Sequence, residues 1–118
     1  MQTLLIVDDD TMISKVMAQY FIDTGYETHA ASSGEDALQY IKNDSIDYLI
    51  TDQRLPGISG LDLLSAALRI NPRIKCILMS GAIDFDIPEN LAALGISEKN
   101  LVQKPERLSV IHKKLSEL

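Results

Sequence analysis

The sequence predicts an α/β domain in which helices cover both faces of a parallel sheet. Short apolar runs of strand length alternate with segments of helical periodicity along the whole chain. The run at residues 3–7 is continuously apolar, as expected for a central strand that is buried on both faces. The connections between them are short, which favours right-handed strand–helix–strand units.

The composition fits one compact globular domain. Of the 118 residues, 46% are hydrophobic and 24% are charged, which supports a single core, so we expect residues 1–118 to form one domain. The 17 acidic residues outnumber the 11 basic ones, for a net charge of −6. This charge opposes attraction to phosphates, so no direct nucleic-acid partner is expected.

The chain also lacks the marks of a membrane or secreted protein. No stretch approaches the ~20 apolar residues of a membrane span. The start, Met1-Gln2-Thr3, has no basic residue of the kind that begins a secretion signal. We therefore expect a cytoplasmic protein with no membrane partner. The single cysteine, Cys76, lies in an apolar run and is expected to be a buried structural thiol.

The first half of the chain is predicted to contain three strands and two helices. The strands are the runs at residues 3–7, 26–31 and 48–51. Asp10 or Thr11 can cap the first helix, and Gly25 is placed to end it. Ser33-Gly34-Glu35-Asp36 resembles a capping box that opens the second helix.

The second half is predicted to continue the alternation. A helix begins after Gly60 and must stop near Asn71, because Pro72 disfavours helical conformation in the residue before it. Pro88 suits the first turn of a short helix running to about Gly95. Strands are expected at residues 75–80 and 101–103. The last helix carries one apolar stripe, formed by Leu108, Ile111, Leu115 and Leu118.

The side chains that can do chemistry stand at the strand ends. Asp8 and Asp9 follow the first strand, Asp52 follows the third, and Ser80 and Lys104 mark the ends of the fourth and fifth. Alone, Asp52 would be interpreted as a turn cap. In a parallel sheet, however, these ends converge on one surface. Clustered carboxylates repel unless a cation such as Mg²⁺ joins them, and Mg²⁺ leaves positions free for a phosphate oxygen. The pattern predicts a phosphoryl-transfer site.

Other kinds of site find little support. His29 and His112 lie away from the acidic strand ends and are expected to be surface or packing residues. Gly57 and Gly60 do not fit a nucleotide-binding fingerprint.

The motifs at the strand ends resemble those of the receiver domains of two-component response regulators. The motifs occur in the family's order, and they are Val7-Asp8-Asp9, Thr51-Asp52 with Leu55-Pro56-Gly57 and Ser59-Gly60, Met79-Ser80-Gly81, and Gln103-Lys104-Pro105. Each motif is weak alone, but four in sequence are highly specific. The resemblance covers essentially the whole chain and implies a flavodoxin-like, doubly wound sheet of five parallel strands in the order 2-1-3-4-5, flanked by about five helices.

The resemblance also implies the metal site. Asp52 matches the aspartate that accepts a phosphoryl group, and it contributes to binding of Mg²⁺. Asp9 matches a direct Mg²⁺ ligand, and Asp8 matches a carboxylate that acts largely through metal-bound water. Arg54 matches the position whose backbone carbonyl completes the shell of the metal.

The resemblance further implies how the phosphorylated state is bound. Ser80 and Lys104 match the hydroxyl and the ammonium group that bind the acyl phosphate. The bond between Lys104 and Pro105 matches one that is usually cis in the family. Leu101 stands three residues before Lys104, where the family commonly has an aromatic residue whose rotation reports phosphorylation, and a leucine cannot make the same switch.

The implied role is that of a signalling phosphoacceptor, with at most self-catalysed phosphoryl transfer and autodephosphorylation. The implied donor is the phosphohistidine of a sensor histidine kinase or phosphotransfer protein. The output would pass to an effector domain or a partner protein. The sequence leaves open whether the chain is part of a longer regulator and whether it forms a phosphorylation-dependent homodimer through its last two helices.

Two other hypotheses remain at this stage. A small phosphatase of the haloacid dehalogenase type would use Asp8 as nucleophile and Asp10 as general acid and base. Against it, Met12 stands where that family has threonine or valine, and no acidic metal pair follows Lys104. An interaction module that is not phosphorylated would show no Mg²⁺-dependent phosphoryl uptake.

Overall fold

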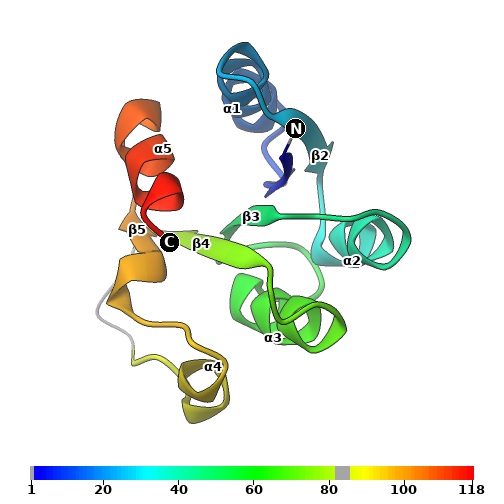
Figure 1. Cartoon of the computed structure of the whole chain (residues 1–118), viewed down its shortest axis with the longest axis vertical. Helices are drawn as coiled ribbons and strands as arrows, with labels where there is room; N and C mark the ends of the chain where they lie inside the picture. Colours follow the sequence, from blue (N-terminus) through cyan, green and yellow to red (C-terminus); the bar gives the residue numbers. More distant parts are fainter. Residues whose placement is uncertain (1, 82–85) are drawn as a thin grey trace.

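The computed structural model describes residues 2–81 and 86–118, and its central feature is a parallel sheet between two layers of helices (Figure 1). The five strands are β1 (Thr3–Val7), β2 (Glu27–Ala31), β3 (Tyr48–Asp52), β4 (Lys75–Ser80) and β5 (Leu101–Gln103). Their order is β2-β1-β3-β4-β5, and each neighbouring pair is parallel. The predicted doubly wound sheet is confirmed.

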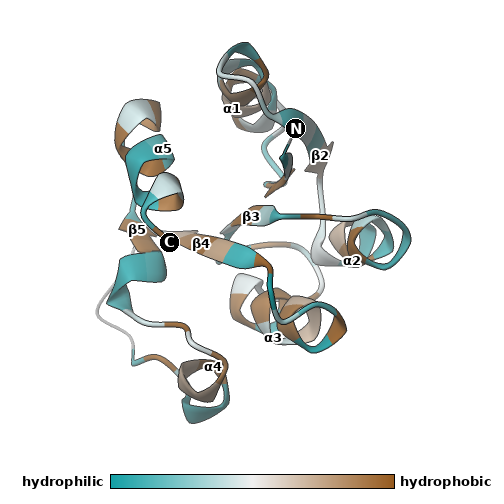
Figure 2. Cartoon of the chain, in the orientation of Figure 1, coloured by the Kyte–Doolittle hydropathy of each residue, from teal (hydrophilic) through white to brown (hydrophobic). Residues whose placement is uncertain are grey.

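The helices lie on both faces of the sheet. They are α1 (Thr11–Asp23), α2 (Gly34–Asn43), α3 (Gly60–Ile70), α4 (Glu89–Ala93) and α5 (Leu108–Ser116), with a 3-10 turn, η1, at Glu98–Asn100. In Figure 1, α1 and α5 cover one face, and α2, α3 and α4 cover the other. In Figure 2, α3 is mostly hydrophobic, whereas α5 shows both hydrophobic and hydrophilic residues.

Each face of the sheet has its own hydrophobic core. Leu5, Leu49 and Leu78 pack with α2 and α3 residues, while Ile6 and Ile50 pack with α1 and α5 residues on the opposite face. Successive side chains of a strand point to opposite faces, so one strand contributes to both cores. This double burial explains why β1, β3 and β4 are largely apolar rather than alternating, whereas the edge strand β2 is mostly polar and partly exposed.

The predicted element ends agree closely with the structure. The Asp10 side chain caps α1, and the Ser33 side chain caps α2. The prediction for the last helix is wrong at its end, because α5 stops at Ser116. Leu118 lies beyond the helix but still packs against the core shared with α1.

Within the described part of the chain, no helix combines the length and the hydrophobicity needed to cross a bilayer.

Candidate functional site

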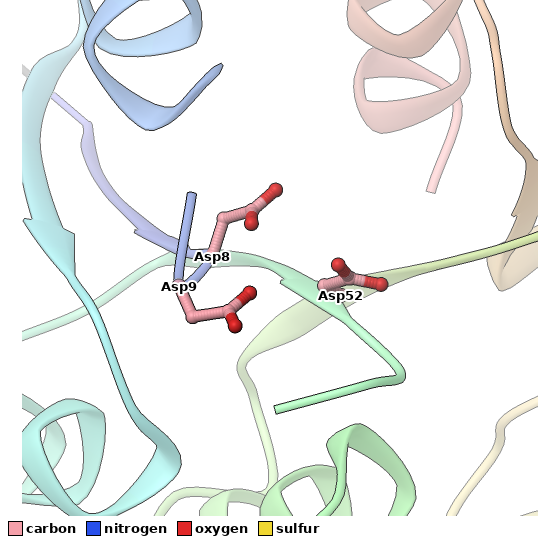
Figure 3. Close-up of side chains that lie close together, drawn as sticks. All are labelled: Asp8, Asp9 and Asp52. Carbon is pink, nitrogen blue, oxygen red and sulfur yellow. The ribbon is translucent and has the colours of Figure 1, made fainter. Parts of the chain in front are cut away.

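Three carboxylates meet at the carboxyl ends of β1 and β3 (Figure 3). Asp8, Asp9 and Asp52 each place one carboxylate oxygen within 4.8 Å of those of the other two. Asp8 is 1% exposed and Asp52 is 8% exposed, whereas Asp9 faces the solvent. The structure therefore brings together the acidic residues that the sequence analysis placed at this edge.

The strand register explains why these residues meet. β1 and β3 are neighbours, and Val7 pairs with Thr51. The next residue of each chain segment is then Asp8 or Asp52, so the two carboxylates leave the sheet side by side. Asp9 follows directly before α1 begins, with Asp10 as the capping residue of that helix.

Lys104 supplies the positive charge of the site. Its Nζ lies 2.7 Å from Oδ2 of Asp52 and 3.8 Å from Oδ2 of Asp8. The backbone N–H of Lys104 donates to the carbonyl oxygen of Ser80 at 2.8 Å, and the bond between Lys104 and Pro105 is cis. Ser80 is 8% exposed at the end of β4. The parallel pairing of β4 and β5 thus brings Ser80 and Lys104 to the same edge as the carboxylates.

The electrostatic environment of Asp8 is the most unusual in the site. Its Oδ1 accepts a hydrogen bond from the backbone N–H of Asp10 at 2.9 Å, whereas its buried Oδ2 has no hydrogen-bond donor among the described residues. Burial raises the pKa of Asp8, and the negative charges of Asp52 and Asp9 act in the same direction. The Asp10 N–H and the Lys104 charge lower that pKa in part. A buried carboxylate oxygen without a donor is unfavourable, and a bound cation would compensate it.

Hydrogen bonds connect the loop after β3 to the end of β3 itself and to α2. The backbone N–H of Arg54 makes a long hydrogen bond of 3.4 Å to Oδ1 of Asp52, and Arg54 itself is exposed. Further along, Gly57 has a positive φ of 78°, and the carboxylate of Glu35 on α2 accepts from the N–H of Ile58 at 3.3 Å. The sequence analysis gave Glu35 no role at the site, because only the fold shows that α2 begins beside this loop.

The structure places the other candidate residues elsewhere. Asp10 accepts from the N–H groups of Met12 and Ile13, so its carboxylate is engaged in capping α1. His29 packs against Tyr40, with ring centroids 5.3 Å apart. His112 packs edge-on against the rings of Tyr20, Phe21 and Tyr26.

Cys76 is buried as predicted, and this burial raises its pKa to about 12.

Comparison with known proteins places this arrangement in a family. Residues 4–116 match the family described as the response regulator receiver domain. The chain belongs to this family. Among curated proteins, this receiver domain is 29% identical to the chemotaxis protein CheY of Pseudomonas aeruginosa, over 98% of the chain and 94% of CheY. It is 27% identical to a cyclic di-GMP phosphodiesterase of Thermotoga maritima over 97% of the chain, but it spans only 30% of that protein.

A solved structure that contains Mg²⁺ is also similar to this chain. The response regulator TrrA of Thermotoga maritima, solved in complex with Mg²⁺ and BeF, is 26% identical to this receiver domain. The match covers 99% of the chain and 98% of TrrA, with a TM-score of 0.84. Receiver domains are two-component phosphoacceptors, generally not enzymes, and they bind Mg²⁺ in an acidic pocket. The haloacid dehalogenase hypothesis is therefore wrong, and its expected general acid, Asp10, is a helix cap here.

Proposed function

We propose that Asp52 is the residue that accepts the phosphoryl group, and that residues 1–118 act as one receiver domain. One observation carries the proposal. Carboxylate oxygens of Asp8, Asp9 and Asp52 lie within 4.8 Å of one another, and Nζ of Lys104 lies 2.7 Å from Oδ2 of Asp52. The side chain of Asp52 is 11% exposed, so it remains partly open to the solvent at the end of β3. An incoming phosphorus atom can approach it there.

The proposed metal ligands are Asp8, Asp9, Asp52 and the backbone carbonyl of Arg54. All are oxygen donors, as Mg²⁺ prefers, and Oδ2 of Asp8 is a buried oxygen with no hydrogen-bond donor among the described residues. These residues therefore fit the ion. When bound, Mg²⁺ would neutralise negative charge on the transferring phosphoryl group.

The residues of the chain have distinct roles in the proposed transfer. A carboxylate oxygen of Asp52 forms a bond to phosphorus in line with the N–P bond of the donor phosphohistidine, which breaks as the imidazole leaves. Lys104 and Ser80 then bind the oxygens of the new acyl phosphate. The phosphate adds about −1.5 to −2 charges if it behaves like other phosphorylated side chains. Lys104 and Ser80 can follow this charge inward, which would move the segment between β5 and α5.

The donor is proposed to be a sensor histidine kinase or phosphotransfer protein that docks on α1. Met12, Ile13 and Val16 are 78%, 42% and 63% exposed on this helix, which is unusual for apolar side chains. They line a groove of about 460 Å³ together with Pro105, Leu108 and Ile111. Lys104 lines the same groove and contacts Asp52, so a protein seated there would lie beside the acceptor.

Three parts of the proposal concern the cellular role. The chain acts in the cytoplasm, and its chemistry is limited to self-catalysed phosphoryl transfer and autodephosphorylation. Its output passes to an effector domain or to a partner protein.

The test is incubation of the purified chain with acetyl phosphate and Mg²⁺, followed by intact mass measurement and peptide mapping. We expect a mass increase of one phosphoryl group, carried by a peptide that contains Asp52 and absent when the metal is chelated. A modified peptide without Asp52 would overturn the site assignment. No uptake at all would favour an interaction module that is not phosphorylated.

A further inference from the structure

Gln53, the residue directly after Asp52, is fixed by three hydrogen bonds to two other elements. Its backbone N–H donates to the carbonyl oxygen of Met79 on β4 at 2.8 Å. Its backbone carbonyl accepts from the N–H of Gly60 at 2.9 Å, and its side-chain Oε1 accepts from the N–H of Leu61 at 2.8 Å. The residue next to the acceptor is thereby bound to β4 and to the start of α3.

The bonds to α3 complete the cap of that helix. The first N–H groups of a helix have no partner within the helix. In α3, the first two are satisfied by Gln53, and the next two are satisfied by the side chain and the carbonyl of Ser59. α1 and α2 are capped by the residue immediately before each helix. In α3, by contrast, Ser59 supplies one part of the cap. Gln53, which is remote in sequence and follows the phosphoacceptor, supplies the other part.

The packing between α3 and β3 leaves little freedom at this junction. A Cβ added to Gly60 would collide with the carbonyl oxygen of Asp52 and with Cα of Gln53. The start of the helix therefore rests directly on the backbone of the acceptor. Gln53 and Asp52 share a peptide bond, so this contact joins the start of α3 directly to the backbone of Asp52.

The hydrogen bond from the Arg54 N–H to Oδ1 of Asp52 adds a second link. It spans Gln53, so the backbone angles of Gln53 decide whether the bond forms. The backbone carbonyl of Arg54, which we have proposed as a metal ligand, belongs to the next peptide unit, so its position depends in part on where Gln53 places Arg54.

We propose that Gln53 is a positioning residue for the phosphoryl-transfer site. The hydrogen bond between its side chain and the N–H of Leu61 holds the carboxylate of Asp52 and the carbonyl of Arg54 in the arrangement that binds Mg²⁺. This inference rests on the proposed function. The side chain of Gln53 acts through its neighbours and contacts neither the metal nor the phosphoryl group.

The test compares two halves of the same helix cap. Gln53→Met removes the acceptor of the Leu61 N–H at similar side-chain length, and Ser59→Ala removes the other side-chain acceptor of the cap. We expect both variants to lower the urea midpoint of unfolding. Only Gln53→Met should weaken Mg²⁺ binding, by about tenfold, as is typical when a group that orients metal ligands is lost. Calorimetric titration of Mg²⁺ measures this difference.

Two further measurements separate positioning from general stability. In the metal-free protein, Gln53→Met should speed hydrogen exchange at the amide of Arg54, whereas Ser59→Ala should leave that amide unchanged. The rate of phosphorylation by acetyl phosphate should fall about as much as Mg²⁺ affinity in Gln53→Met. If Gln53→Met does not fold, Gln53→Asn is judged by the same criteria, because its side chain is too short to reach the N–H of Leu61.

Equal Mg²⁺ affinities of the Gln53 and Ser59 variants would overturn this inference, while phosphorylation of the wild-type chain on Asp52 would leave the proposed function intact. Failure of the wild-type chain to be modified on Asp52 would instead overturn the proposed function itself.

Discussion

The two sides of the site differ in how extensively their strands are paired. The first side carries the acidic residues at the ends of β1 and β3, and the second carries Lys104 after β5. On the first side, β1 pairs with β2 over five residues and with β3 over four, and the acidic residues stand directly at the strand ends. On the second side, β5 pairs with β4 over three residues and is preceded by the five-residue α4 and the short turn η1. Segments with few backbone pairings open at lower free energy than paired central strands. We infer that the first side holds the reacting groups still, and that the second side, with Lys104, is the one that moves.

Leu101 sharpens this contrast. It is half-buried at the start of β5 and packs against the core formed with α2 and α3. The sequence resemblance leads us to expect an aromatic residue at this position, and a leucine would not report phosphorylation by the same rotation. On the acidic side, Asp8, Asp9 and Asp52 lie together as the sequence analysis expected.

The largest predicted effect on phosphorylation comes from substituting Asp52 on the first side. Asp52→Asn keeps the size of the side chain but removes the nucleophilic carboxylate, so uptake from acetyl phosphate should fall below detection in intact mass spectra. A circular dichroism spectrum like that of the wild type would show that the fold is retained. Normal uptake by the folded variant would place the acceptor at another residue.

A smaller effect is expected from the second side. Lys104→Met removes the ammonium group that is proposed to bind the acyl phosphate. This should slow phosphorylation by on the order of 10²-fold, as for the loss of one hydrogen-bond donor that stabilises charge in a transition state. Mg²⁺ should bind as tightly or more tightly, because a competing cation 2.7 Å from Asp52 is gone. Calorimetry and phosphorylation kinetics together test this. A variant that loses Mg²⁺ affinity would contradict the division between the two sides.

The exposed apolar residues of α1 should affect only transfer from a protein. Val16 is 63% exposed, so Val16→Glu should leave the fold and the reaction with acetyl phosphate unchanged. Transfer from a histidine kinase that phosphorylates the wild-type chain should slow by about tenfold, since a charge replaces apolar contact area at an interface. Equal slowing with both donors would mean that the substitution disturbs the site itself.

Leu101→Tyr is expected to leave the chemistry nearly unchanged. The side chain packs against the core formed with α2 and α3, so the phosphorylation rate should stay within about twofold of the wild type. Stability should fall by about 1 to 3 kcal/mol, because the larger ring overfills a packed region. Urea unfolding and phosphorylation kinetics measure the two quantities. A large change in rate would show that the output side controls the chemistry.

The smallest effect is expected at Cys76, in the buried part of β4. With a pKa of about 12, only about one thiol in 10⁴ is ionised at pH 8, and burial also blocks access. Alkylation of the native protein should therefore be as slow as unfolding, at the same rate with and without Mg²⁺ and acetyl phosphate. A rate that changes on phosphorylation would show that the rearrangement reaches the sheet interior.

The sequence predicted the features that depend on order along the chain. The apolar runs, their turns and the rule that parallel strand ends converge were enough to bring Asp8, Asp52 and Lys104 to one edge. It could not predict the hydrogen bond between Gln53 and Leu61, because a remote helix cap depends on how α3 packs on β3. The groove on α1 was missed for a similar reason, since helical periodicity does not reveal that Met12 is 78% exposed in the folded chain.

The most direct test of the central claim is a crystal structure of the chain grown with Mg²⁺ and beryllofluoride. We predict one Mg²⁺ ion bound directly by Asp9, Asp52 and the backbone carbonyl of Arg54, and by Asp8 through a metal-bound water. We also predict beryllofluoride on the carboxylate of Asp52, with Nζ of Lys104 on a fluorine atom. An ion held away from Asp52, or beryllofluoride attached to another aspartate, would contradict the account.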